Sequence, residues 1–234
     1  MGQPFIVYGK PGSGKTRSLI NFGPEDIVYF NVEDKLPPFR QKFKYVCKSK
    51  NIEVIKKWLK RMEKIPCKIA VIDDATYIMS SEFMREHSKV KQGASTFDMF
   101  NNIADTVWKL FQFVKKELPE DTFVYFIMHE DTNDNGSTKL LTIGKLLDSK
   151  VMIEGMVTIC LRCLSEDGHH FFKTVTDGTD ITKSPEGMFA ADEIDNDLKA
   201  VDDKIREFYG FKEPEQAEDI TEEEKLNAET NNIR

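Results

Sequence analysis

Residues 7–20 read VYGKPGSGKTRSLI and contain the spacing Gly-x-x-x-x-Gly-Lys-Thr. Each fixed position of this phosphate-binding-loop pattern has a physical reason. The glycines let the backbone turn through conformations that other residues avoid, so that its N–H groups can approach phosphate oxygens. Lys15 is expected to reach the β- and γ-phosphates of a nucleotide, and the Thr16 hydroxyl to bind Mg²⁺. The predicted nucleotide-binding residues are Gly9, Pro11, Gly12, Ser13, Gly14, Lys15 and Thr16.

The residues on both sides of this loop favour a ligand site over a plain glycine-rich turn. Phe5 to Tyr8 form a short apolar run that suits a buried strand, and Arg17 to Ile20 can continue as a helix. The positive end of that helix would point at the bound anion. This strand–loop–helix order is the setting that the motif needs.

Length and composition limit the class of protein. A chain of 234 residues with 40% hydrophobic residues is long enough for one α/β domain with a real core and a tail. It contains neither an apolar run of membrane-spanning length nor a charged-then-apolar leader, and its four cysteines suit a reducing compartment. We therefore expect a soluble cytoplasmic protein without membrane contact. The phosphate-binding loop predicts ATP and Mg²⁺ as its cofactors.

The net charge of −7 is unevenly distributed. Residues 192–234 carry a net charge of −9, which leaves +2 for residues 1–191. Between Lys35 and Lys68 the chain has twelve lysines and arginines against only Glu53 and Glu63. This basic segment could track a nucleic-acid backbone, or it could be the solvated face of an amphipathic helix over 51–64. The sequence leaves both interpretations open.

Strands and helices alternate along the first two thirds of the chain. Strands are predicted over 26–31, 44–47, 68–73 and 122–128, and helices over 51–64 and about 97–117. This pattern predicts an α/β fold with a mostly parallel central sheet flanked by helices. Farther along, strand-like runs at 156–164 and 170–176 predict a C-terminal β-hairpin, and 195–209 a last helix. The expected division is a core at 1–191, a C-terminal helix region at 192–211 and a disordered acidic tail at 212–234.

Two acidic residues follow the predicted strand over 68–73. A strand that ends in Asp73 places a carboxylate at the carboxyl edge of the sheet, where it can hold Mg²⁺ together with Thr16. Asp74 is either an acidic catalytic partner or the first polar residue of a loop, and the sequence does not decide between them.

Two further catalytic candidates end neighbouring strands. Glu33 follows the strand over 27–32 and is the preferred general base for a water aligned on the γ-phosphate. His129 follows the strand over 123–128 and is either a sensor of that phosphate or a structural histidine.

Several stretches together resemble one family. The order GKPGSGKT (9–16), YFNVEDKL (29–36), AVIDDAT (70–76) and FIMHED (126–131) is similar to the RecA-like branch of P-loop ATPases. More closely, LLTIGKLLDSKVMIEGMVTICLRC (140–163) and FFKTVTDGTDITKSPEGMF (171–189) resemble the small phage-encoded AAA-family ATPases known as single-strand annealing proteins of the Sak group. The resemblance covers about residues 3–209, and KSPEGMF (183–189) is its most specific element.

This resemblance implies a RecA-like P-loop core. It also implies that the protein hydrolyses ATP with Mg²⁺, binds single-stranded DNA and promotes its annealing or recombination. It implies a homo-oligomer, and possibly a single-stranded DNA-binding protein as a further partner. RecA-like sites usually lie between subunits, where a cation from the adjacent chain balances the γ-phosphate charge. The candidates for that trans-acting cation are Lys145, Lys173 and Lys183.

The resemblance leaves some points open. The segments 77–96 and 130–145 fall where such proteins hold DNA-binding loops, yet neither is strongly basic. Stacking of bases on Tyr77, Phe83 or Phe97 could supply affinity instead, although aromatic side chains more often pack in a core. The alternative functions are a nucleotide or small-molecule kinase, and a nucleotide-gated binding module with little turnover.

Overall fold

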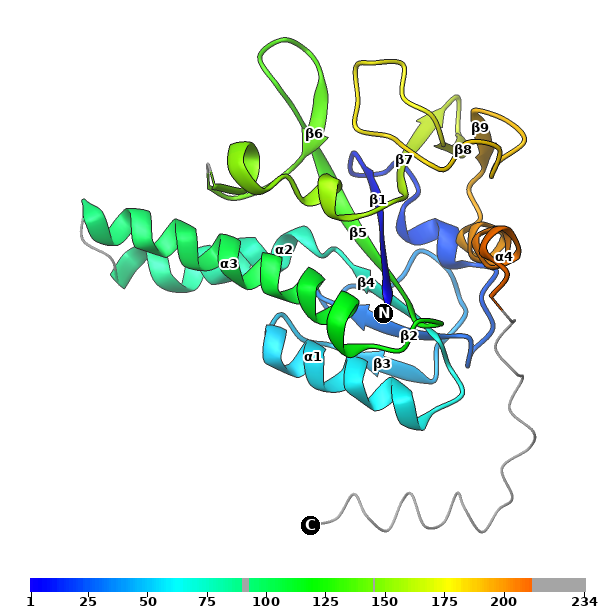
Figure 1. Ribbon diagram of the computed structural model, residues 1–234, viewed down its shortest axis with the longest axis horizontal. Coiled ribbons are helices and arrows are strands. Elements are labelled where there is room, and N and C mark those ends of the chain that lie inside the picture. Colours follow the sequence, from blue (N-terminus) through cyan, green and yellow to red (C-terminus); the bar gives the residue numbers. More distant parts are fainter. Residues whose placement is uncertain (90–92, 145, 212–234) are drawn as a thin grey trace.

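The computed structural model of the chain describes residues 1–89, 93–144 and 146–211 (Figure 1). Within these residues nine strands form a sheet in the order β3-β2-β4-β5-β1-β7-β8-β9, and β6 pairs with the end of β5. The strands are β1 (Gln3–Gly9), β2 (Ile27–Asn31), β3 (Tyr45–Cys47), β4 (Ile69–Asp73), β5 (Phe123–Thr132), β6 (Thr138–Leu140), β7 (Cys160–Glu166), β8 (His169–Lys173) and β9 (Glu193–Asp195).

The central strands are parallel, as the alternation of strands and helices predicts. Strands β3, β2, β4, β5, β1 and β7 run in one direction, and β6, β8 and β9 pair antiparallel with their neighbours. In this register Gly9 lies opposite His129, and Asn31 lies opposite Asp73. The carboxyl ends of four strands therefore meet at one edge, where α/β sheets bind ligands.

Alternate residues of the strands supply two hydrophobic cores, one on each face of the sheet. Phe126 and Met128 of β5 belong to the core under α1 (Ile52–Arg61), α2 (Thr76–Glu86) and α3 (Ala94–Glu117). Tyr125 and Ile127 belong to the opposite core, which includes residues of η1 (Thr16–Leu19) and α4 (Leu198–Tyr209). Figure 1 shows α1, α2 and α3 on one side and α4 on the other. The prediction of a mixed α/β fold with a mostly parallel sheet flanked by helices is confirmed.

The segment after the phosphate-binding loop differs from the expected helix. Only one turn of 3₁₀ helix, Thr16–Leu19, follows the loop. The next residues include Gly23 and Pro24, and both are unfavourable to helix continuation because glycine loses much backbone freedom and proline restricts the residue before it. The axial dipole of a long helix is therefore absent at this loop, and the phosphate-binding N–H groups are those of the loop itself.

The two segments expected as DNA-binding loops are largely regular structure. Residues 77–89 lie in α2 and in the short 3₁₀ helix η3 (His87–Lys89), and α3 already begins at Ala94 rather than near 97. Residues 130–140 form the antiparallel pair of β5 and β6. Lys145 and residues 90–92 lie outside the described residues.

Strand β7 and the last helix start later than expected, whereas β8 starts at His169, one residue earlier. A π-helical turn, η4 (Leu147–Val151), and a 3₁₀ turn, η5 (Ile153–Met156), precede β7, which pairs antiparallel with β8 across Asp167 and Gly168. Helix α4 starts at Leu198 because the Asp197 carboxylate caps it, accepting from the backbone N–H of Lys199 at 3.0 Å. The predicted tail over 212–234 lies outside the described residues.

Helix α4 contains a buried ion pair, and both of its residues contact side chains of the sheet. Arg206 Nε donates to Asp202 Oδ2 at 2.7 Å, and Tyr125 OH donates to Asp202 Oδ1 at 2.7 Å. The Arg206 guanidinium also lies 3.9 Å from the centre of the Phe123 ring. Both charged residues are almost fully buried, so removing either one would leave the charge of the other uncompensated.

Among the described residues, no helix has the length and apolar character that crossing a membrane requires.

Candidate nucleotide site

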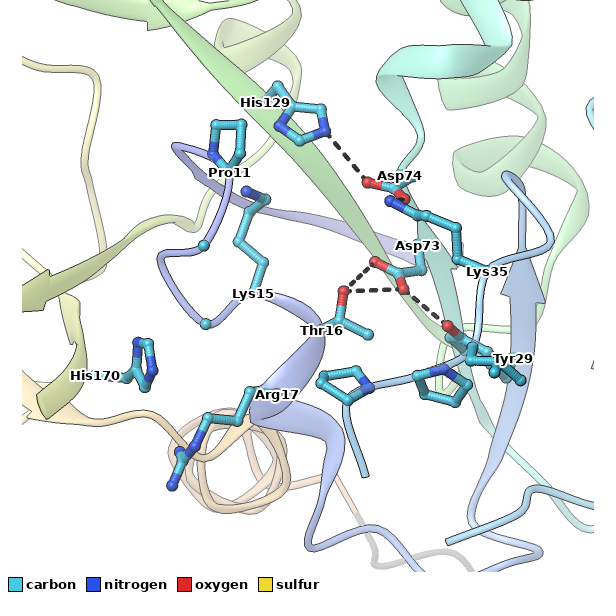
Figure 2. Close-up of a pocket in the computed structure, with 15 residues that line it drawn as sticks. Pro11, Lys15, Thr16, Arg17, Tyr29, Lys35, Asp73, Asp74, His129 and His170 are labelled. Carbon is cyan, nitrogen blue, oxygen red and sulfur yellow. Dashed lines mark hydrogen bonds and ion pairs between the residues drawn. The ribbon is translucent and has the colours of Figure 1, made fainter. Parts of the chain in front are cut away.

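A pocket of about 370 Å³ opens at the carboxyl edge of the parallel strands (Figure 2). Its walls come from the loop after β1, the loop after β2, the ends of β4 and β5, and the start of β8. Pro11, Gly12, Gly14, Lys15 and Thr16 all line it. The loop that the sequence assigns to phosphates is therefore part of a real cavity.

Lys15 points back over its own loop. Its Nζ donates to the carbonyl oxygens of Gly9 at 2.8 Å and Lys10 at 2.7 Å. The side chain is buried, and this burial lowers the pKa of Lys15. An ammonium group that is held by two neutral carbonyl groups in a buried position is well placed to exchange them for phosphate oxygens, because an anion compensates buried positive charge better.

The loop around Lys15 has the shape of an anion cradle. Gly12 and Gly14 have φ values of +82° and +104°, which side chains rarely tolerate. A Cβ on Gly14 would also lie 2.7 Å from Nδ1 of His170, whose ring approaches the Ser13 carbonyl at 2.8 Å. The buried Ser13 hydroxyl has no hydrogen-bond partner among the described residues. These features fit a loop that encloses a phosphate group.

Asp73 and Thr16 form the pair that would hold a metal ion. The Thr16 hydroxyl lies 3.1 Å from both carboxylate oxygens of Asp73, and Tyr29 OH donates to Oδ2 at 2.8 Å. Burial, with a smaller effect from the neighbouring Asp74, raises the pKa of Asp73 to about 6. A buried carboxylate beside a hydroxyl offers the hard oxygen ligands that Mg²⁺ prefers, and a bound cation would relieve the burial of its charge. The residues present fit this ion.

Asp74 also lines the pocket. Its backbone has φ +61°, in the left-handed region, and its carboxylate lies between His129 and Lys35. Oδ1 is 3.2 Å from Nε2 of His129, and Oδ2 forms an ion pair with the Lys35 ammonium. Burial raises the pKa of Asp74, but these two partners outweigh it and hold the pKa below its usual value. Asp74 is therefore a charged carboxylate that faces the pocket.

His129 lies between the phosphate-binding loop and the aspartates, because β5 separates β1 from β4 in the sheet. Its backbone N–H donates to Thr76 Oγ1 at 2.9 Å, and the Tyr77 ring packs edge-on against the imidazole at 5.4 Å between centroids. Its buried Nδ1 has no hydrogen-bond partner among the described residues. His129 thus keeps an unused polar atom in the wall of the cavity.

Glu33 does not join this group. Its carboxylate pairs with Lys50 at 2.6 Å, and Glu33 is not among the residues that line the pocket in the described part of the chain. The reason is the turn after β2, where the Asn31 side chain bonds both the N–H and the carbonyl group of Lys35. This turn directs Lys35 to the pocket and Glu33 away from it, so the geometry favours Asp74 over Glu33 as the base.

The lysines suggested as trans-acting cations have different surroundings. Lys173 donates to Asp177 and Asp180, each at 2.8 Å, so its charge is already compensated within the chain. Lys183 pairs through its backbone with Cys160, and its charge contributes to a lowered pKa of Lys115 on α3. Lys145 lies outside the described residues.

Sequence reasoning missed several residues that line the pocket, among them Arg17 and three residues that contact the predicted site. Tyr29 supports Asp73, Lys35 pairs with Asp74, and His170 approaches the phosphate-binding loop from β8. The position of Lys35 just after a strand was a usable signal. Nothing in the sequence around His170 indicates that β8 folds back beside this loop.

Comparison with known proteins adds a family. No curated protein matches the chain. A protein-family model described as an AAA domain matches residues 1–192, which include each of the pocket residues discussed above. The match covers most of the chain and agrees with the phosphate-binding loop, the Thr16–Asp73 pair and the parallel sheet. The chain therefore belongs to the AAA-type family of P-loop ATPases.

Proposed function

We propose that this protein is a RecA-like ATPase that binds ATP with Mg²⁺, hydrolyses it, and uses this cycle to bind and anneal single-stranded DNA in phage recombination or replication. The observation that supports the nucleotide part most strongly is the convergence of Lys15, Thr16, Asp73 and Asp74 on one pocket. The DNA part rests on the family resemblance of the sequence.

Each residue of the pocket has a distinct role in the proposed reaction. Lys15 and the loop N–H groups bind the β- and γ-phosphates, while Thr16 and Asp73 hold Mg²⁺. The ion, when bound, neutralises charge on the phosphate oxygens. Asp74 orients a water molecule and accepts its proton as the water oxygen bonds to the γ-phosphorus. The bond from that phosphorus to the bridging oxygen breaks, which leaves ADP and phosphate.

His129 connects Asp74 to the rest of the site. Its Nε2 lies beside the Asp74 carboxylate, and its free Nδ1 remains in the cavity wall. We assign it the role of a sensor that holds Asp74 in place and responds to the γ-phosphate. Tyr77 packs on this ring and is itself partly exposed, so a DNA base stacked on Tyr77 would be linked to the sensor through the Tyr77 ring.

The surface offers both charge and aromatic rings for a DNA strand. Phe97 on α3 is 69% exposed, whereas Phe83 stacks on Phe100 and is only partly available. In the basic segment 35–68 many lysines are paired within the chain, for example Lys44 with Glu25 and Lys68 with Asp121. Arg40, Lys42 and Lys57 form no ion pair with another described residue, and these are our candidates for contacting phosphates.

The wider setting is part of the same proposal. A homo-oligomer would place a lysine of the adjacent subunit near the γ-phosphate, with Lys183 as the first candidate because Lys173 is already paired. A single-stranded DNA-binding protein would be a natural further partner. All four cysteines are free thiols, which suits the cytoplasm of a host cell.

A nucleotide-gated module with little turnover is a second candidate, and one observation favours it. Glu33 lies outside the pocket, and Lys35 compensates the charge of Asp74, so both candidate carboxylates are already paired. A kinase is the third reading, and a screen of phosphate acceptors would identify it.

The test measures phosphate release and DNA binding in parallel. ATP turnover is followed with and without single-stranded DNA, and a mobility-shift assay compares single- and double-stranded DNA with and without ATP. Lys15→Ala is the inactive control. DNA-stimulated turnover supports the ATPase, and ATP-dependent DNA binding without turnover supports the module. If the wild-type protein shows neither ATP turnover nor DNA binding, the proposal is contradicted.

A further inference from the structure

A second ammonium group, that of Lys35, reaches the nucleotide pocket from the same chain (Figure 2). We propose that Lys35 binds the γ-phosphate of the nucleotide and is a catalytic residue supplied in cis, which exchanges Asp74 for that phosphate when a triphosphate enters. This inference rests on the proposed function and names a residue of that same site.

The backbone of Lys35 is fixed in position. Asn31, buried at the end of β2, uses both ends of its amide: Nδ2 donates to the Lys35 carbonyl oxygen at 2.7 Å, and Oδ1 accepts from the Lys35 N–H at 3.1 Å. Asp34, the residue before Lys35, has φ +51°, which completes the tight turn. A side chain anchored in this way starts from a defined point, so less conformational entropy is lost when its end group binds.

The end group of Lys35 has two contacts, and both can be exchanged. Its ammonium pairs with Asp74 Oδ2 and lies 5.9 Å from the centre of the Tyr77 ring. The side chain is 60% exposed, so the ammonium can swing without opening the core. Burial raises the pKa of Asp73, and the charge of Lys35 opposes this rise, so Lys35 acts on both carboxylates of the site.

The charges of the pocket explain why the exchange would occur. Lys15 and Lys35 line the same cavity as Asp73 and Asp74, and Arg17 also lines it, but of these three cations Lys35 is the one in an ion pair with Asp74. A triphosphate brings further negative charge beside Asp74, and an ammonium group moving to the γ-phosphate reduces their repulsion. The same movement frees Asp74 to accept a proton from water. ADP has no γ-phosphate, so with ADP Lys35 stays on Asp74.

The experiment compares the affinities of a non-hydrolysable ATP analogue and of ADP for the full-length protein, with Mg²⁺. The variants are Lys35→Met, which removes the charge, and Lys35→Arg, which keeps it. Lys48→Met is the matched control, because Lys48 is 59% exposed and pairs with Asp34 outside the pocket. Thermal unfolding of each variant checks that the fold is retained, and turnover is measured in the same samples.

We expect Lys35→Met to lower the affinity for the ATP analogue by about tenfold, which is the size of a lost charge-assisted contact. The affinity for ADP should be unchanged. Lys35→Arg should keep the preference for the triphosphate, and Lys48→Met should behave like the wild type. Equal losses for both nucleotides, or no loss for either, would overturn the inference while leaving the ATPase proposal intact. If the wild-type protein binds neither nucleotide, the proposed function itself fails.

Discussion

Replacing Asp73 by asparagine should stabilise the protein in the absence of metal and nucleotide while abolishing its Mg²⁺-dependent turnover. Asp73 is only 4% exposed, and its pKa is raised from 3.8 to about 6 because burial disfavours its charged form. At about 1.36 kcal/mol per unit, this shift corresponds to a cost of about 3 kcal/mol for keeping Asp73 ionised at neutral pH.

Asparagine has nearly the same shape and no charge. Its amide can still accept from Tyr29 and bond Thr16, and the pKa of about 6 already includes what these two contacts contribute to the charged form. The gain expected for Asp73→Asn is therefore about 3 kcal/mol in the free energy of unfolding at neutral pH. A cation bound to the wild-type carboxylate would cancel this advantage.

The sign of the pH dependence follows from the raised pKa. Between about pH 4 and 6 the folded protein binds more protons than the unfolded chain, so the contribution of Asp73 to stability falls as the pH rises through this window. The gain of the variant should be largest above pH 6, decrease by roughly half near pH 5, and nearly vanish near pH 4.

Urea unfolding in a chelating buffer at several pH values measures this gain. Asp105→Asn is the control, because Asp105 is exposed and pairs with Lys109 one helical turn away. Losing this surface ion pair should change the free energy of unfolding by at most about 0.5 kcal/mol. A variant at Asp73 that is less stable than the wild type at neutral pH, or equally stabilised at all pH values, would refute the reasoning.

Four further predictions concern other parts of the molecule. Lys15→Ala should abolish nucleotide binding and leave circular dichroism and the unfolding midpoint close to the wild type, since the two hydrogen bonds that the ammonium loses go to carbonyls of its own loop. Turnover like the wild type would exclude this pocket as the active site. Asp74→Asn should slow turnover by about 10²- to 10⁴-fold, as expected for a lost general base, while Glu33→Gln should have little effect. If a steady-state assay shows the larger loss for Glu33→Gln, Glu33 is the base. Arg206→Met should lower the free energy of unfolding by about 3–5 kcal/mol because it leaves the buried Asp202 without its cationic partner, and an unchanged denaturation curve would contradict that. Truncation after Gly210 should keep ATP binding and tighten single-stranded DNA binding at low salt, because an acidic tail competes with DNA for basic surface; a salt titration that gives identical affinities would rule this out.

The sequence alone was sufficient for the class of fold and for the centre of the site. The phosphate-binding loop has a local cause, since its glycines, Lys15 and Thr16 act through their own backbone and spacing. Asp73 could be placed with Thr16 because buried parallel strands end at one edge, and that rule needs only the pattern of apolar runs. The other strands and helices α1, α3 and α4 followed from the same hydrophobic periodicity, with errors of a few residues at their ends, whereas α2, β6 and β9 were not predicted.

Only the tertiary structure decided which of the polar residues at that edge reach the pocket. Glu33 and Lys35 are two positions apart on one turn, and the bonds from Asn31 direct Lys35 inward and Glu33 toward Lys50. His170 reaches the loop from a strand more than 150 positions away, as its 2.8 Å approach to the Ser13 carbonyl shows. Periodicity specifies which face of an element is buried, but the direction of a side chain in a turn and the partner of a returning strand depend on contacts between distant segments, which a local pattern does not contain.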